Sequence, residues 1–151
     1  MSNSFSVSSS PQIAASEASI KAYISNTLDL SFVTPSDDLL HSNGELKGHV
    51  GDVYYKVKET RCGYSGNIRV SFQIRTAAAG TCYGKVYIND VARGIERSTP
   101  ANGWVEFTED FSVSSNDLIQ VWVKHSESNQ NAIASGLNLK GTFQRNFVTI
   151  I

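Results

Sequence analysis

The stretch IRVSFQIR, residues 68–75, alternates apolar and polar side chains without a break. Successive side chains of a β-strand point to opposite faces, so the apolar residues share one face and the polar residues share the other. The stretch therefore predicts a strand with one face in a core and the other turned outward. On this basis Phe72 is expected to be its largest core side chain.

The same alternation recurs further along the chain, in residues 82–88 (CYGKVYI) and 119–124 (IQVWVK) and more briefly in residues 105–111. Segments rich in Gly, Asn, Ser and Pro separate these runs, and none of the intervening segments has a helical period. Short strands at roughly ten-residue spacing predict an all-β fold, an antiparallel, jelly-roll-like β-sandwich. The expected core residues are Ile68, Val70, Phe72, Val86, Ile88, Val121 and Val123.

The N-terminal part has a different composition, since six of its first ten residues are Ser and the first charged residue is Glu17. Such a stretch has too few apolar residues to form a core. We therefore divide the chain into an N-terminal arm, residues 1–36, and a sandwich domain, residues 37–151. Within the arm, residues 11–26 fit a short helix and an irregular segment equally well. Residues 28–32 alternate like a short strand, which Pro35 is expected to end.

Composition excludes several classes of partner. The 151 residues include 13 basic and 14 acidic side chains, for a net charge of −1. Nothing in this balance favours nucleic acid or an anionic membrane surface. No apolar run approaches the roughly 18 residues of a membrane span, and the first residues do not have the pattern of a secretory signal. Synthesis in a cytoplasm is therefore expected.

Residue types that carry chemistry are sparse. Cys62 and Cys82 lack the neighbouring Cys or His of a zinc site, and we expect two free thiols, with Cys82 on a buried face. A disulfide formed later is the alternative.

No nucleophile motif is present, and neighbouring carboxylates on a strand point to opposite faces, unlike a glycosidase pair. A loop calcium site using Asp37, Asp38 or Asp117 is a minor alternative. The sequence thus predicts a protein without catalytic residues, cofactor or metal.

Several large aromatic side chains are expected on the outward face of the sandwich. If residues 53, 55 and 57 face the core, Tyr54 points outward together with Lys56 and Lys58. By the same alternation Tyr83, Tyr87 and Trp122 point outward on their strands. Because the outer face of a sandwich should be polar, these rings indicate a covered surface. A neighbouring subunit, the N-terminal arm or a sugar are the three candidates for the cover.

A series of short phrases between residues 37 and 139 resembles a small β-sandwich module found in virion proteins of tailed phages and their proviruses. The phrases are DLL (38–40), KVKE (56–59), SGNIRVSF (65–72), YGKVYIN (83–89), ERST (96–99), FTED (107–110) and DLIQV (117–121). The chain departs from that family in its short N-terminal arm and its additional C-terminal segment, residues 142–151.

The resemblance implies a non-enzymatic structural component of a phage virion, made in the host cytoplasm. A head decoration (cement) protein or a small tail accessory protein is the first expectation. Its implied partners are other virion proteins and further copies of itself, most simply in a trimer. The alternative is a receptor- or carbohydrate-binding module at a tail tip, which binds a host-surface glycan through the outward rings. An enzyme is the least favoured interpretation.

The N-terminal arm is the expected docking element. Its apolar side chains recur too regularly for a plain spacer, and they gain order by packing on a partner. The arm residues assigned to partner binding are Phe5, Val7, Ile13, Ile20 and Ile24; on the sandwich the assigned residues are Tyr54, Tyr83, Tyr87 and Trp122.

Deleting residues 2–26 should leave a folded sandwich, because the expected core lies outside the arm. The truncated protein should have the strand content of the full chain by circular dichroism but should no longer enter virions. Incorporation at the level of the full chain would contradict the docking role of the arm.

Overall fold

The computed structural model describes residues 30–146, with side chains for residues 32–144. The chain divides into two compact units, Phe32–Phe143 and a second unit of Met1–Ser31 with Gln144–Ile151. The described part is built from strands, and nothing helical in it has the length and apolar character of a membrane span. The first unit contains nearly all of the described residues, including every residue of the predicted core.

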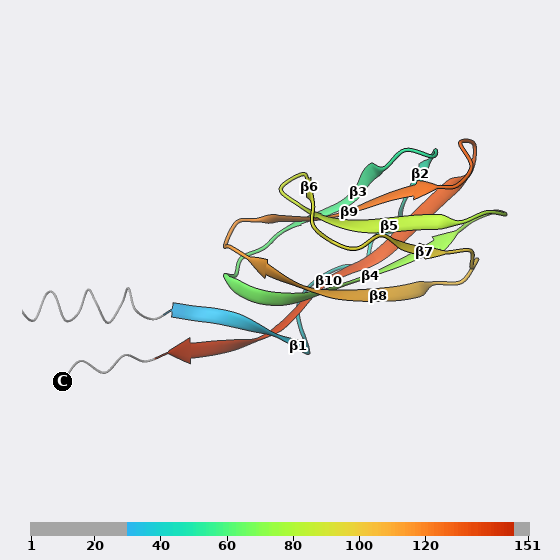
Figure 1. Cartoon of the computed structure of the whole chain (residues 1–151). Helices are drawn as coiled ribbons and strands as arrows, with labels where there is room; N and C mark the ends of the chain where they lie inside the picture. Colours follow the sequence, from blue (N-terminus) through green and yellow to red (C-terminus); the bar gives the residue numbers. More distant parts are fainter. Residues whose placement is uncertain (1–29, 147–151) are drawn as a thin grey trace, which may run out of the picture. The chain divides into compact units, whose positions relative to one another are not determined.

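Two five-stranded sheets form this unit (Figure 1). Sheet A has the spatial order β2-β10-β1-β4-β8. Its strands are β1 (Leu30–Asn43), β2 (Lys47–Val50), β4 (Gly66–Thr76), β8 (Val105–Val113) and β10 (Asn131–Asn146). Strand β4 contains the stretch at residues 68–75 and pairs antiparallel with β8 from Gly66↔Val113 to Ile74↔Val105.

Sheet B has the order β3-β9-β5-β6, with β7 also paired to β5. Its strands are β3 (Tyr55–Arg61), β5 (Cys82–Ile88), β6 (Val91–Ala92), β7 (Arg97–Thr99) and β9 (Leu118–His125). The predicted antiparallel sandwich is thus confirmed. One described pairing departs from it, since β1 and β4 run parallel at Val33↔Gly66.

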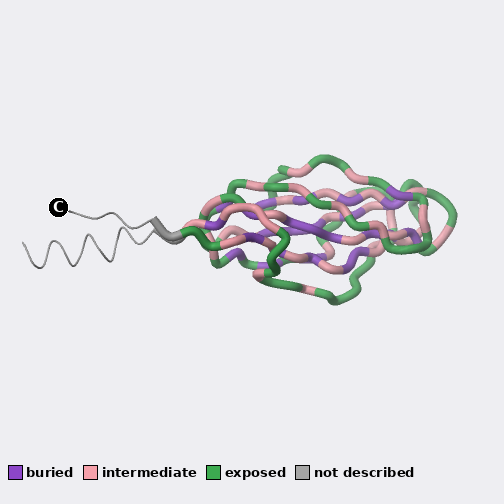
Figure 2. Tube along the Cα trace, turned by 90° about the horizontal axis from the view of Figure 1, so that it is seen from below, coloured by how far each residue is buried: buried purple, intermediate pink, exposed green. Residues whose placement is uncertain are grey.

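The core lies between the sheets, where Figure 2 shows the buried stretches along the middle of the unit. All seven predicted core residues are buried: Ile68, Val70, Phe72, Val86, Ile88, Val121 and Val123. Phe72 in sheet A faces Gly84 in sheet B, where an added Cβ would lie 3.0 Å from the Phe72 ring. Gly84 thereby lets a large ring fill the space between the sheets.

The prediction for residues 53–58 is wrong in part, because a β-bulge changes the register of β3. Tyr55 pairs with Val123 and Lys56 with Trp122, but Lys58 then pairs with Val121, so Val57 is the inserted residue. A bulge exchanges the two faces for the residues that come after it. Lys58, predicted to point outward, is therefore buried.

The buried Lys58 donates through Nζ to the backbone and side-chain oxygens of Asn43, both at 3.1 Å. Burial lowers the pKa of Lys58 from its usual value. Val53, which was expected in the core, precedes the strand and is 71% exposed.

The prediction that Pro35 ends a strand is also wrong, since β1 continues through it to Asn43. Proline lacks an amide N–H, so it interrupts a strand only where a neighbour needs that donor. Beyond Pro35, side chains help to hold β1 against β10: the Thr142 hydroxyl donates to the Asp38 carboxylate (3.0 Å) and lies 2.8 Å from the Ser36 hydroxyl, from which it can accept a hydrogen bond. The division that we expected at residue 36 falls within this strand.

Both cysteines are free and buried, and Cys82 lies on the inward face of β5 as predicted. Burial raises the pKa of the Cys82 thiol to about 11. Residues 11–26, for which a short helix was one expectation, lie outside the described residues. The arm residues Phe5, Val7, Ile13, Ile20 and Ile24 also lie outside them.

Replacing Phe72 by Ala should lower the free energy of unfolding by about 3–5 kcal/mol, because it removes a buried ring and leaves a cavity between the sheets. Urea unfolding monitored by circular dichroism measures the loss. Phe143→Ala, at a ring that is 48% exposed, serves as the control and should change stability far less. Equal losses in the two variants would contradict the central position of Phe72.

Candidate functional site

The outward side of sheet B carries the aromatic side chains that the sequence placed there, and we call it the aromatic face. It is defined by Tyr54, Tyr83, Tyr87 and Trp122, each half-buried. The pairing of β5 with β9 sets their positions: Tyr83 lies opposite Lys124, Lys85 opposite Trp122, and Tyr87 opposite Gln120. Strand alternation therefore brings Tyr83, Tyr87 and Trp122 to one surface, and Tyr54, from the segment before β3, joins them by packing against Tyr87.

Tyr87 and Trp122 form the centre of the aromatic face. Their ring centroids are 4.4 Å apart and their planes differ by 17°, so the rings are stacked. Tyr54 packs at an angle against Tyr87, with centroids 6.4 Å apart. Offset and tilted packing of this kind stabilises neighbouring rings by about 0.5–1.5 kcal/mol beyond their burial. The rings are thus ordered before any ligand arrives.

A lysine lies between two of these rings. The Lys124 ammonium is 4.8 Å from the centre of the Tyr54 ring and 5.0 Å from that of Tyr83, within the range of cation–π attraction. Glu96 neutralises it at 3.8 Å and also accepts a 2.7 Å hydrogen bond from the Tyr54 hydroxyl. Burial, and then this bond to a carboxylate, raise the pKa of Tyr54 well above its usual value, so the phenol stays protonated.

Beneath the rings, the fully buried Gln120 amide fixes the position of Trp122. Its oxygen accepts the Trp122 indole N–H at 3.1 Å and the Asp90 backbone N–H at 3.2 Å. Its nitrogen donates to Glu59 and to Asp90, both at 2.8 Å. Two acceptor sites and two donors are all that an amide side chain offers, so Gln120 is fully bonded.

The two carboxylates of this network share one cation. Lys56 lies 2.7 Å from Glu59 and 3.7 Å from Asp90. The bond from Lys56, and then the bond from Gln120, lower the pKa of Glu59. Glu59 is therefore ionised at neutral pH and helps to hold the ring support in place.

The structure brings together the four sandwich residues that the sequence assigned to partner binding, while their role as binding residues stays a prediction. Gln120, Lys85 and Lys124 were not singled out from the sequence. The sequence did contain a pattern that identifies them: all three alternate with core residues on the same strands as the rings, and they therefore point outward. Glu96 was not foreseeable in this way, because it lies on a loop.

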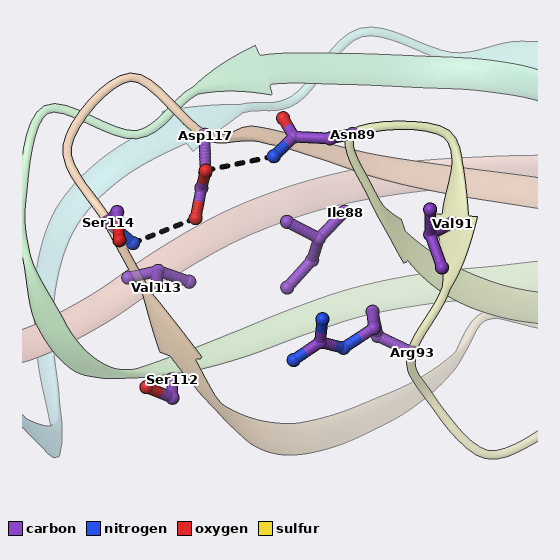
Figure 3. Close-up of a pocket in the computed structure, with 8 residues that line it drawn as sticks. All are labelled: Ile88, Asn89, Val91, Arg93, Ser112, Val113, Ser114 and Asp117. Atoms are coloured by element: carbon purple, nitrogen blue, oxygen red, sulfur yellow. Dashed lines mark hydrogen bonds between the residues drawn. The ribbon is translucent and has the colours of Figure 1, made fainter.

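A pocket of about 410 Å³ lies elsewhere, where the β5–β6 turn faces the end of β8 (Figure 3). Its wall is held by Asp117, which accepts hydrogen bonds from the Ser114 backbone N–H (2.8 Å) and the Asn89 amide (2.9 Å). The bond from Ser114 and, to a smaller extent, the bond from Asn89 lower the pKa of Asp117. The pocket contains the Arg93 side chain but no aromatic ring, which makes it a weaker candidate for binding a sugar.

The acidic residues considered for calcium serve the loops and strands instead. Asp37 pairs with Arg69 at 3.1 Å, Asp38 accepts from Thr142, and Asp117 binds its own loop. Among residues 30–146, no group of three or more His, Cys, Asp or Glu side chains is placed to hold a metal ion. His125 is buried and bonded on both ring nitrogens, to Thr76 and to the backbone of Glu127.

Comparisons with known proteins concern the fold. No protein-family model and no curated protein sequence matches the chain. A solved family 35 carbohydrate binding module from an environmental isolate is similar in structure, with a TM-score of 0.52 and 9% identity over 79% of this chain and 90% of that one.

A second similar structure contains the CBM22-1 and GH10 modules of an endo-1,4-β-D-xylanase from Clostridium thermocellum. Its TM-score is 0.49 at 10% identity, and the match covers 70% of this chain but only 29% of that one. At such identities a likeness shows a shared fold and no more. The family 35 module, with the higher TM-score of the two, is the one that supports the β-sandwich fold.

Replacing Gln120 by Ala should free the Trp122 indole and leave its N–H without a protein partner. We expect the free energy of unfolding to fall by about 1–3 kcal/mol, and the emission of Trp122 to shift to longer wavelength as water reaches it. The measurement is made in a Trp104→Phe background, so that all tryptophan emission comes from Trp122, because the chain has two tryptophans. Unchanged emission and stability would show that Gln120 does not hold the ring.

Proposed function

We propose that the sandwich unit, Phe32–Phe143, is a non-catalytic carbohydrate-binding module that binds a glycan across the aromatic face. The observation that carries this proposal is the ordered set of rings on an outward sheet face, centred on the Tyr87–Trp122 stack. Sugar rings have apolar C–H faces that pack on aromatic rings and hydroxyls that bond to polar groups. The aromatic face offers both kinds of partner.

Preorganisation supports this proposal. A ligand that meets fixed rings loses less binding energy to side-chain ordering, which costs about 0.5–1.5 kcal/mol for each immobilised side chain. Here the ring packing and the bond to Gln120 have already ordered Trp122. The face is therefore suited to a ligand that rests on it without rearrangement.

The acidic groups favour binding over catalysis. Hydrolysis of a glycosidic bond ordinarily requires two carboxyl groups that flank the scissile bond. On the aromatic face, Glu59 and Asp90 are bonded to Gln120 and paired with Lys56, and Glu96 is bonded to Tyr54. These carboxylates are committed to holding the surface. The family 35 carbohydrate binding module with a similar fold is consistent with such a role.

This proposal corresponds to the alternative drawn from the sequence rather than to its first expectation. A structural role in a phage particle, docking through residues 1–36 and assembly into a trimer all stay predictions. A position at a tail tip is equally a prediction. Binding of a glycan is the part for which the geometry gives support.

A glycan array followed by calorimetry tests the proposal. Trp122→Ala should weaken binding to every retained glycan by about tenfold or more, as the loss of a central aromatic contact does in other interfaces. Tyr87→Ala should have a similar effect, because it removes the stacked partner. Trp104→Ala is the matched control, since Trp104 lies just before β8 in sheet A and over Arg75.

The controls separate loss of binding from loss of folding. Each variant should show the strand content and cooperative unfolding of the unchanged protein. If the unchanged protein retains no glycan, or if Trp104→Ala weakens binding as much as Trp122→Ala, the aromatic face is not a carbohydrate site.

A further inference from the structure

The lysines of the aromatic face differ in how their charges are neutralised. Lys56 is paired with Glu59 and Asp90, and Lys124 is paired with Glu96. Each of these two ammonium groups therefore has at least one carboxylate close by. Their charges are part of the support of the rings and are not free for a ligand.

Lys85 is the exception on this face. It lies on β5 between Tyr83 and Tyr87, and its position in the sheet is directly opposite Trp122. Among the described residues, its ammonium has no ion-pair partner and its side chain makes no hydrogen bond. Lys56 and Lys124, by contrast, both form ion pairs. The register thus places Lys85 next to Trp122, and no carboxylate of the described residues forms an ion pair with it.

The strand register fixes the position of Lys85 relative to Trp122 and Lys56. Trp122 pairs with Lys85 on one side and with Lys56 on the other. Neighbouring strands lie about 4.8 Å apart, so the two lysine positions are separated by roughly 10 Å with the indole between them. Lys56 lies 2.7 Å from the Glu59 carboxylate and 3.7 Å from that of Asp90, whereas no carboxylate of the described residues forms an ion pair with Lys85. A ligand over Trp122 therefore meets a more positive environment toward β5.

We propose that the glycan bound by the aromatic face carries a negatively charged substituent, a carboxylate or a sulfate, which contacts Lys85. This inference rests on the proposed function and names the class of its ligand. The rings pack on the sugar, and the free ammonium pairs with the anionic group. A charge-assisted bond beside apolar rings is stronger than the same bond in open solvent.

The probes are matched pairs that differ only in charge. A trisaccharide of galacturonic acid is compared with its methyl ester, which has the same backbone without the carboxylate charge. A trisaccharide of galactose is compared with its sulfated form. The first pair tests a carboxylate and the second tests a sulfate, so the two sources of the anionic group are distinguished.

The unchanged full chain should bind at least one charged probe about tenfold more tightly than its neutral partner, the size expected for one charge-assisted bond at a partly exposed site. Lys85→Gln should remove this preference, because it should weaken the binding of the charged probe by about tenfold more than that of the neutral probe. Lys85→Arg should retain the preference, because it keeps the positive charge. Lys140→Gln, which removes a lysine from sheet A, is the control and should behave like the unchanged chain.

The possible failures are distinguishable. If neutral and charged probes bind equally, or if Lys85→Gln keeps the preference for the charged probe, the inference about the anionic group is wrong and the carbohydrate site stands. If no probe binds and no glycan is retained on the array, the proposed function fails as well. Binding of the charged probes that survives Trp122→Ala would indicate general attraction of anions and would overturn the inference.

Discussion

The antiparallel pairing of β5 with β9, in the register Val86↔Val121, determines both faces of sheet B at once. Because side chains alternate along each strand, this single register places Val86, Ile88 and Val121 in the core and Tyr87 and Trp122 on the outer surface. A shift by one residue would bury the rings and expose the core residues. The packing between the sheets and the candidate binding surface therefore depend on the same set of backbone hydrogen bonds.

The aromatic face is stabilised by polar groups that belong to the protein itself. Gln120 has no exposed surface, and a buried amide is tolerated only when its donors and acceptors are bonded. Glu59, Asp90 and the Trp122 indole supply the partners. Lys56 and Lys124 both have carboxylate partners on this face, whereas Lys85 has no ion-pair partner among the described residues, which makes its charge informative.

The two candidate sites on the described residues differ in the chemistry they offer. The pocket at the β5–β6 turn has polar walls fixed by Asp117 and Asn89 but contains no ring. The aromatic face is open and contains four rings, which suits an extended ligand that rests on a surface. A family 35 carbohydrate binding module has a similar fold, and a fold by itself determines neither the ligand nor the chemistry of a site.

Strict alternation in residues 68–75, 82–88 and 119–124 was sufficient to predict the sandwich, its core and the outward direction of Tyr83, Tyr87 and Trp122. This works because period two is a local property of the strand, and burial of one face follows from it. The bulge at Val57, the continuation of β1 through Pro35 and the bonds of Gln120 were decided by the tertiary structure. Each depends on which strand lies alongside, and the register between segments distant in the chain is not encoded in either segment alone.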